Sequence, residues 1–277
     1  MTAGGGVSGR TTRSGTERGR APSDRVLDLF AVPPSAAPLV GSRGAYVAGD
    51  LVLSPLAPGD DVDRSWLAPT MARLAVRLDE DPGRVTGALR LAVPVPARDG
   101  SITVDGWEAH RFEPGTTVVR DPAVVRAAGR LLHARLAIEV RRPAGVGLPD
   151  LVELPATSPT GEQQRLLQRI EEAGRSLAAP PSRTPQLVHA GLPGRVLLDP
   201  SGSPVVLQVV PAWDLAARAD ARCVVTAVLD GDAPGETLAA LSSVQRTRVL
   251  EVLPAMLTRD TLHDATAYAE VLDELGA

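Results

Sequence analysis

Residues 188–210 read VHAGLPGRVLLDPSGSPVVLQVV, and this stretch decides the fold that the sequence predicts. A loop that contains His189 leads into two apolar runs, residues 194–198 and 204–210. The segment between them, residues 199–203, consists of Asp, Pro, Ser and Gly, the residue types that favour turns. Two apolar runs around such a turn predict a β-hairpin. A hairpin of this kind can present side chains to a cleft from rigid backbone, or it can be an ordinary surface hairpin.

Upstream of this stretch the pattern is that of short strands. Glycine turns and apolar runs over residues 41–55 predict a hairpin and a following strand. Apolar residues recur at helical spacing over residues 64–78. Residues 85–96 and 101–113 are interpreted as further strands, joined by a hairpin turn at Asp99-Gly100. Together these segments predict a small antiparallel sheet with one helix.

Helical periodicity begins after Gly115. Residues 122–139 predict a long helix, and residues 160–177 predict a polar helix that opens with a capping box at Thr160. Three or four further helices are expected from about residue 216 to the end. Strands followed by helices predict an α+β protein of two lobes. We place the β-rich lobe at residues 25–116 and the helical lobe at residues 117–277.

The N-terminal segment has the composition of a disordered tail. Residues 1–24 contain Gly, Ser, Thr and Arg and almost no large apolar side chain, so they cannot bury enough surface to offset the entropy of ordering. A basic tail could contact nucleic acid or anionic lipid, but a solvated tail or an upstream start codon is the favoured interpretation. Order is expected to begin with a short helix over residues 24–30, with Ser23 as its N-cap.

Composition excludes several classes of function. The net charge is −4 and only 3% of the residues are aromatic, which argues against a specific nucleic-acid site built on stacking. No apolar run is long enough to cross a membrane, and no signal peptide is visible, so the cytoplasm is the expected compartment. The single cysteine, Cys223, excludes an internal disulfide and is expected to be a buried thiol. The four histidines lack metal-ligand spacing, and no metal site is predicted.

Residues 188–210 resemble the catalytic loop and metal strand of the aminoglycoside-phosphotransferase and choline-kinase-like superfamily. Its pattern is H-G-D-L-x-x-x-N, a turn, and a strand that ends in a metal-binding Asp. The order of expected elements agrees over residues 25–277. The resemblance implies a two-lobe protein-kinase-like fold, with a small antiparallel sheet lobe followed by a mainly helical lobe. Short phrases at residues 49–55, 106–107, 188–190 and 209–213 are also similar to an uncharacterised actinobacterial family of that superfamily.

The resemblance implies that the functional positions of the catalytic hairpin are changed. The catalytic Asp, which accepts the proton of the substrate hydroxyl, aligns with Gly191. The metal-binding Asn aligns with Arg195 if the loop is one residue short, and with Val196 otherwise. The metal-binding Asp of the strand aligns with Gln208, whose neutral amide is a poor ligand for Mg²⁺. His189 matches the family histidine, which orients the loop.

In the first lobe the same comparison assigns the phosphate-binding Lys to Ser54, and the helix Glu that pairs with it to Pro69. A possible adenine hinge falls at residues Arg111, Phe112 and Glu113. The chain contains no asparagine. It contains no lysine either, since all 29 residues counted as Lys or Arg are Arg. A GC-rich coding sequence accounts for that absence at the surface, but not at a catalytic position.

The expected function is therefore that of a catalytically inactive, pseudokinase-type protein, with no catalytic residue, no metal and no cofactor. It would bind an unidentified small molecule or protein. The alternative is an ATP-dependent small-molecule phosphotransferase with a displaced site, for which Asp199 and Asp214 are the nearest carboxylates. Both are more readily interpreted as a turn residue and a helix N-cap. Arg195 could hold a phosphate directly, so weak metal-independent nucleotide binding stays open. A decaying paralogue without a selected role is the third reading.

Overall fold

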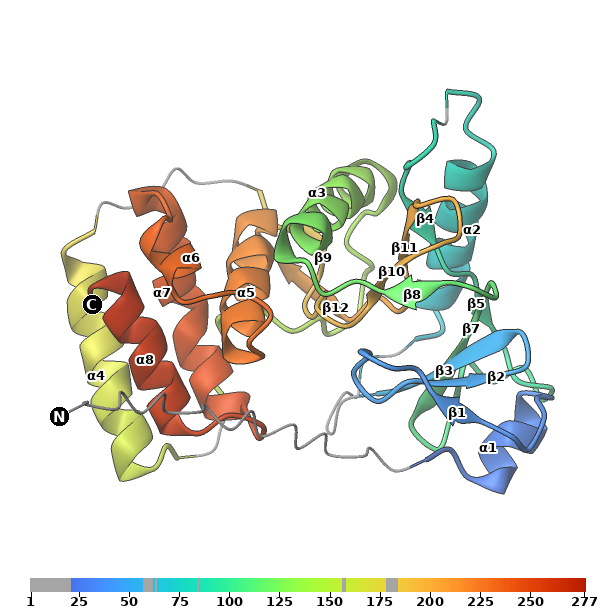
Figure 1. Ribbon diagram of the computed structural model, residues 1–277, viewed down its shortest axis with the longest axis horizontal. Coiled ribbons are helices and arrows are strands. Elements are labelled where there is room, and N and C mark those ends of the chain that lie inside the picture. Colours follow the sequence, from blue (N-terminus) through green and yellow to red (C-terminus); the bar gives the residue numbers. More distant parts are fainter. Residues whose placement is uncertain (1–20, 57–61, 63, 84, 156–157, 178–183) are drawn as a thin grey trace, which may run out of the picture.

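In a computed structural model, the chain is described over residues 21–56, 62, 64–83, 85–155, 158–177 and 184–277. Of the expected tail, residues 1–20 lie outside the described residues. The two larger sheets lie on one side, the helices between residues 161 and 275 gather on the other, and the helix of residues 122–139 lies between them (Figure 1). Among the described residues, no helix is both long and apolar enough to cross a membrane.

The first helix confirms a local prediction. Helix α1 (Asp24–Leu29) starts after Ser23, whose hydroxyl accepts a hydrogen bond from the backbone N–H of Val26 at 3.4 Å. Val26 and Leu27 are buried against the first sheet, in one cluster with Trp107. The cap satisfies an N–H that the helix itself leaves unpaired, and the apolar face fixes the helix to the sheet.

The first sheet is antiparallel and has the order β1-β2-β3-β7-β5, with β6 paired to the free part of β7. Its strands are β1 (Ala37–Pro38), β2 (Tyr46–Ala48), β3 (Leu51–Pro55), β5 (Pro94–Val95), β6 (Thr103–Val104) and β7 (Trp107–Arg111). The central pair matters most for the site, because its register places Ser54 on β3 directly opposite Glu108 on β7. Directly opposite residues project from the same face of a sheet.

The strand predictions between residues 85 and 113 were wrong in detail. Residues 85–89 are not in a strand. The predicted turn at Asp99-Gly100 is present, since the N–H of Gly100 donates to Ala97 at 2.9 Å and that of Ala97 to Ser101 at 2.8 Å, but a second turn, at Asp105-Gly106, joins β6 to β7. Asp105 and Gly106 have φ values of 48° and 81°, as a two-residue hairpin turn of the type I′ kind requires. An Asp-Gly pair occurs at both places, and pairing with β7 decides which one joins neighbouring strands.

Helix α2 (Leu67–Asp79) begins three residues later than expected. Its third residue is Pro69, which is tolerated only in the first turn because that turn leaves its N–H groups unpaired. The buried residues of the helix recur at helical spacing and face the largest apolar cluster: Leu67, Met71, Leu74 and Leu78.

The second sheet joins segments that are distant in the sequence. Its order is β4-β11-β10-β8, with β4 (Arg90–Leu91), β8 (Thr117–Val118), β10 (Val196–Leu198) and β11 (Pro204–Val206). The predicted hairpin is the β10–β11 pair, with Leu197 opposite Val205. Its second strand ends at Val206, earlier than the sequence suggested, and β4 runs parallel to it.

The remaining elements form the helical part of the chain. Helix α3 (Pro122–Glu139) coincides with its prediction, and α4 (Gly161–Arg175) carries the predicted capping box. Two short strands that the sequence did not predict, β9 (Gln186–His189) and β12 (Pro211–Asp214), pair with each other. Four helices complete the chain, as expected: α5 (Ala216–Leu229), α6 (Glu236–Ala239), α7 (Ser243–Arg259) and α8 (Ala265–Leu275).

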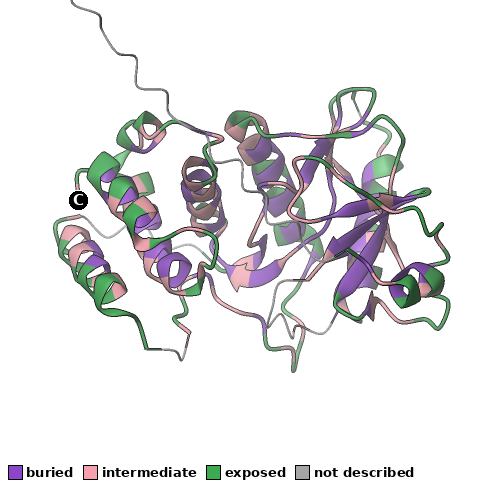
Figure 2. Cartoon of the chain, turned by 60° about the horizontal axis from the view of Figure 1, so that its bottom comes forward, coloured by how far each residue is buried: buried purple, intermediate pink, exposed green. Residues whose placement is uncertain are grey.

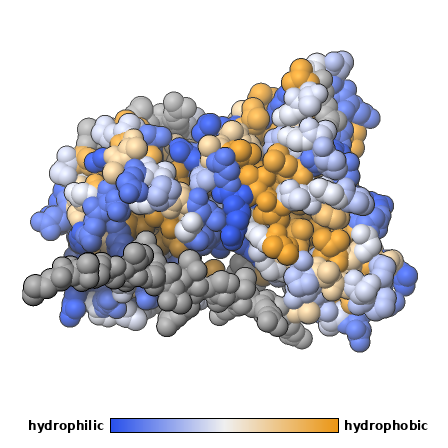
Figure 3. All heavy atoms as spheres, viewed as in Figure 1, coloured by the Kyte–Doolittle hydropathy of each residue, from blue (hydrophilic) through white to orange (hydrophobic). Residues whose placement is uncertain are grey.

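Burial is continuous from the sheets to the helices (Figure 2). Leu132 and Leu136 of α3 are 0% exposed and pack in the same cluster as α2, the hairpin and Leu187 of β9. In the space-filling view a hydrophilic strip runs beside apolar side chains that gather over the sheet carrying the hairpin (Figure 3). Where α3 meets α5, Arg126 and Asp220 form a two-bonded ion pair with distances of 2.9 and 2.6 Å.

Candidate functional site

The loop after β9 is shaped by two buried histidines. His189 is 1% exposed, and its Nδ1 accepts a hydrogen bond from the backbone N–H of Gly191 at 3.0 Å. The backbone N–H of His189 donates in turn to Nε2 of His133 on α3 at 3.1 Å. His189 therefore folds the loop back on itself, and His133 fixes it to α3.

Burial keeps these imidazoles neutral. It lowers the pKa of His133 to about 4 and that of His189 well below its ordinary value of 6.5. Nearby Arg195 and His133 lower the pKa of His189 further. On β7, burial and then the charge of Arg64 lower the pKa of His110 to about 3.

We predict that stability falls as the pH drops from 6.5 towards 4. Unfolding releases the buried imidazoles to their ordinary pKa of 6.5, so in this window the unfolded state binds more protons than the folded state. Each histidine should contribute a slope of about 1.4 kcal/mol per pH unit to the free energy of unfolding. Urea titrations across this range measure the slope. Titration of the His110, His133 and His189 imidazoles near pH 6.5 in the folded protein, followed by NMR, would contradict the prediction.

The structure brings together three of the positions predicted in the hairpin stretch. The guanidinium of Arg195 donates from Nη1 to the carbonyl oxygen of Gly191 at 3.0 Å and from Nε to Oε1 of Gln208 at 3.1 Å. Gln208 is 1% exposed. Arg195 thus links the loop position to the strand position within the protein itself.

A buried ion pair extends this chain of contacts into the first sheet. Nε2 of Gln208 donates to Oε2 of Glu108 at 2.9 Å, and Oε1 of Glu108 lies 3.3 Å from Nε of Arg64. The side chains of Arg64 and Glu108 are 3% and 8% exposed. Arg64 also donates to the carbonyl oxygen of Val209 at 3.1 Å, next to Gln208. We call Arg64, Glu108, Gln208 and Arg195 the cleft network.

Sequence reasoning missed Arg64 and Glu108. Ser54, the position assigned to the lysine, is buried opposite Glu108, and within the described residues its hydroxyl has no hydrogen-bond partner. Pro69, assigned to the helix Glu, is exposed in the first turn of α2 and takes no part in the network. The signal that could have found the pair is Glu108 itself, a carboxylate between the apolar residues Trp107 and Ala109 of a strand, because a buried carboxylate needs a cation.

The backbone groups of the predicted adenine hinge, residues 111–113, form hydrogen bonds with other parts of the chain. The N–H of Phe112 donates to the carbonyl oxygen of Asp50 at 2.9 Å, and that of Arg111 donates to Val93 at 2.9 Å. The carbonyl oxygen of Glu113 accepts from both the backbone N–H and the hydroxyl of Thr116, at 3.2 and 2.6 Å. These contacts hold the segment between the two sheets.

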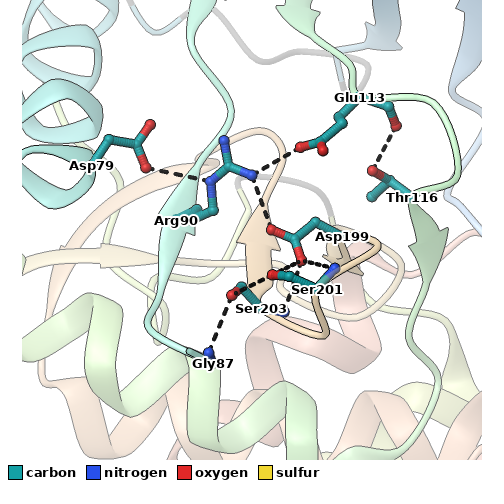
Figure 4. A network of polar contacts seen from close by, with 8 residues as sticks. All are labelled: Asp79, Gly87, Arg90, Glu113, Thr116, Asp199, Ser201 and Ser203. Atoms are coloured by element: carbon teal, nitrogen blue, oxygen red, sulfur yellow. Dashed lines mark hydrogen bonds and ion pairs between the residues drawn. The ribbon is translucent and has the colours of Figure 1, made fainter. Parts of the chain in front are cut away.

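Arg90 connects the hinge, α2 and the hairpin turn (Figure 4). Its guanidinium lies 2.9 Å from Glu113, 2.9 Å from Asp199 and 3.3 Å from Asp79. Asp199 also accepts from the backbone of Ser201 at 2.9 Å, and from Ser203. Burial raises the pKa of Asp199, but the hydrogen bonds from Ser201 and Ser203 and the Arg90 contact lower it to about 2. Asp199 is thus a turn residue, as the sequence indicated.

Asp214 is not the helix N-cap residue that the sequence indicated. It ends β12, and the N-cap of α5 is Leu215 instead. Its carboxylate accepts from the backbone N–H of Leu215 at 2.6 Å and of Leu151 at 3.0 Å, and from Arg218 at 2.9 Å. Burial, and then a hydrogen bond with Asp150, raise its pKa. Asp214 therefore fixes the start of α5 and the loop at Leu151.

Apolar side chains from the two sheets pack directly against each other beside the hinge. Val52 on β3, Leu197 on β10 and Leu207 are 0%, 1% and 4% exposed. Ala45 and Ala92 complete this cluster, which we call the inter-sheet cluster. Partly buried Phe112 of the hinge packs against it. Because no side chain at its centre contacts solvent, the cluster joins the sheets as a core.

The glycine-rich turn at residues 41–44 packs against the loop that follows β9, at Pro193 and Gly194. A Cβ atom at Gly194, where φ is 74°, would lie 3.0 Å from Cγ and 3.2 Å from the backbone N of Arg43. Such a close approach admits only glycine. Arg43 donates to the carbonyl oxygen of Pro193 at 3.2 Å, and its guanidinium pairs with Asp230 after α5.

A large cavity lies behind the loop. Its volume is about 990 Å³, and it reaches from Arg43 and Ala190 to the C-terminal end of α7. The lining includes β12, α5 and the segments 147–155 and 258–263, apart from the undescribed residues. Cys223 on α5 is buried outside it, and burial raises the pKa of its thiol to about 12. In the described part of the chain, no group of three or more His, Cys, Asp or Glu is arranged to hold a metal ion.

Comparison with solved structures identifies the fold. The amicoumacin kinase hAmiN, in complex with AMP-PNP, Ca²⁺ and Ami, matches 91% of this chain and 90% of its own with a TM-score of 0.52 and 13% identity. The chain has an aminoglycoside-phosphotransferase-like fold. This confirms the predicted α+β, two-lobe kinase-like class. At this identity the likeness shows the fold alone.

Two further structures are similar to this kinase-like chain. A choline/ethanolamine kinase family protein from Mesorhizobium loti has a TM-score of 0.46 and 14% identity, over 91% of this chain and 92% of that one. The choline kinase LicA from Streptococcus pneumoniae has a TM-score of 0.45 and 11% identity, over 90% and 96%. No family model and no curated protein matches the sequence.

Proposed function

We propose that this kinase-like chain is a catalytically inactive member of its fold that acts in the cytoplasm by binding a small molecule in the cavity behind the loop. The observation that carries the proposal is the cleft network. Groups of the protein are hydrogen-bonded to one another at the positions that the resemblance assigns to the catalytic Asp, Gly191, and to the metal ligands, Arg195 and Gln208. Glu108 contacts Gln208 and lies opposite the lysine position, Ser54.

The charges at these positions oppose binding of Mg·ATP. The place of the phosphate-binding lysine is taken by Ser54, and the nearest charge across the strand pair is the carboxylate of Glu108. A carboxylate repels phosphate, and it pairs here with Arg64 rather than with a metal ion. Gln208 offers a neutral amide, which is a weak ligand for Mg²⁺. Arg195, which could have held a phosphate, contacts Gln208 and Gly191.

Packing opposes the binding of an adenine base beside the predicted hinge. The hinge N–H groups of Arg111 and Phe112 donate to Val93 and Asp50, so a base would have to displace these bonds. It would also have to separate the inter-sheet cluster, whose Val52 and Leu197 are at most 1% exposed. Opening a packed core exposes apolar surface at a cost of about 25 cal/mol per Å². The cavity, at about 990 Å³, is of the size that small-molecule sites have.

We predict that Mg²⁺ produces no measurable ATP binding and that no phosphate is transferred. Isothermal titration calorimetry with ATP, with and without Mg²⁺, measures the first. Release of ADP with aminoglycoside, choline or homoserine acceptors measures the second, with an active kinase of this fold as positive control. Removing several groups that stabilise the transferring phosphoryl group should leave no rate above background.

The opposite outcome is equally well defined. An Mg²⁺-dependent dissociation constant of about a micromolar or less would show that nucleotide opens the cleft. Phosphate transfer that persists in Gly191→Ala and Gln208→Ala would show that the chemistry uses other residues. Either result would replace the binding role by the displaced-site phosphotransferase.

A further inference from the structure

The cavity behind the loop combines an apolar wall with a few polar groups. The apolar part comes from several elements: Leu148, Val210, Pro211, Leu229, Met256 and Leu262. Thr226, Thr258 and Thr261 also line it, and the hydroxyl of Thr258 donates to the carbonyl oxygen of Pro254 at 2.8 Å. A cavity of this composition suits a small organic molecule whose apolar body is oriented by a single polar end.

Arg222 is the distinctive polar group of this cavity. It lies on α5, one helical turn before Thr226, so both side chains project from the same face of the helix into the lining. Arg222 forms no hydrogen bond or ion pair with any residue that the structure describes. Its side chain keeps partial exposure towards the cavity. Burial lowers the pKa of its guanidinium, and Arg259 and Arg43 lower it further, whereas Tyr268 and Asp260 raise it.

The other charged groups of the lining have partners or face solvent. Arg43 pairs with Asp230, and Arg259 donates to the carbonyl oxygen of Glu153 at 2.7 Å. Asp260 accepts from Tyr268 at 2.8 Å and contacts His263 at 2.7 Å. Asp150 accepts from the backbone of Val152 at 2.8 Å, and the side chain of Glu153 belongs to an exposed residue. Among the described residues Arg222 is thus the partly buried guanidinium of the lining that makes no hydrogen bond or ion pair, although Tyr268 and Asp260 act on it electrostatically.

We propose that the cavity binds a small organic anion, a carboxylate or phosphate monoester with an apolar body, and that Arg222 makes the anion contact. The proposal deepens the binding role and rests on the assignment of the cavity as the ligand site. A planar guanidinium binds a carboxylate or phosphate through two parallel hydrogen bonds. A buried guanidinium that makes no ion pair is costly, and an anionic ligand supplies an ion-pair partner. Thr226 adds a hydroxyl donor on the same helix face.

The test compares four probes that share a phenyl ring and differ in their polar end: phenyl phosphate, benzoate, benzyl alcohol and benzylamine. Ligand-observed NMR with the full chain measures their dissociation constants. We expect at least one anionic probe to bind at about millimolar affinity, and benzyl alcohol and benzylamine to bind at least about tenfold more weakly. Comparing phenyl phosphate with benzoate tells which anion the cavity prefers.

The decisive variant is Arg222→Met, which keeps the stem of the side chain and removes its charge. It should weaken the anionic probe by about tenfold or more and leave benzyl alcohol unchanged. Arg175→Met is the matched control, because Arg175 is exposed on α4, away from the cavity. If Arg222→Met does not fold, the Nε–H resonance of Arg222 in the wild-type chain gives the answer, since it must shift as the anionic probe is added.

Three outcomes would overturn the proposal: neither anion binds, benzyl alcohol or benzylamine binds as tightly as the anions, or the Arg222 variant or resonance is unaffected. None of these results bears on Mg·ATP turnover. The proposed anion contact can therefore be refuted while the inactive role stands. Conversely, phosphate transfer from ATP would refute the inactive role, even if an anion still bound in an Arg222-dependent way.

Discussion

Replacing Glu108 with alanine is expected to lower the free energy of unfolding by about 3–5 kcal/mol. The carboxylate lies between Arg64 and Gln208, with contacts of 3.3 and 2.9 Å, and it is buried. Without it, the guanidinium of Arg64 stays in the interior next to a smaller side chain and loses the carboxylate of Glu108. Equilibrium unfolding in urea, followed by circular dichroism, measures the change.

Two variants make this result interpretable. In Arg64→Met with Glu108→Leu both charges are removed together, and most of the lost stability should return, because apolar residues of similar size often replace a buried ion pair at little cost. Glu171→Ala breaks the exposed pair with Arg175 and should change stability by less than about 1 kcal/mol. A loss below about 1 kcal/mol for Glu108→Ala would mean that groups other than Glu108 stabilise the buried guanidinium of Arg64.

Truncation of Leu197 to alanine should cost about 2–5 kcal/mol. Leu197 is 1% exposed in β10 and belongs to the inter-sheet cluster together with Val52 of β3. The change removes apolar contacts from both sheets and leaves a space beside Phe112 of the predicted adenine hinge. Urea unfolding measures the cost, and adenosine can be added to ask whether the new space accepts a base.

The matched control is Ile138→Ala on α3, where the side chain is 78% exposed and the expected change is within about 0.5 kcal/mol. Similar small losses for Leu197→Ala and Ile138→Ala would contradict direct packing between the sheets. They would instead describe a cleft that opens in solution, which would favour the phosphotransferase alternative over the inactive role.

Local signals were sufficient for the helices and for the hairpin. Ser23 and Thr160 cap helices within three residues of themselves, and α3 ends where its apolar periodicity ends. The hairpin stretch brings Gly191, Arg195 and Gln208 together because a tight turn leaves strands only one arrangement. These contacts span at most 13 residues, so sequence spacing defines them.

The sequence by itself thus indicated the fold class, the helices and the hairpin, and it predicts changed residues in the hairpin stretch. The strands β9 and β12 came only from tertiary pairing. Only the tertiary structure decided which turn joins β6 to β7, and that Glu108 lies across from Ser54 and pairs with Arg64. The contact of Glu108 with Gln208 spans 100 residues of sequence. Arg222 likewise lines one cavity with Arg43 and Arg259, which are distant from it in the sequence. Sheet register and helix packing create such neighbours, because the free energy that selects them comes from burying a shared core, which no single segment encodes.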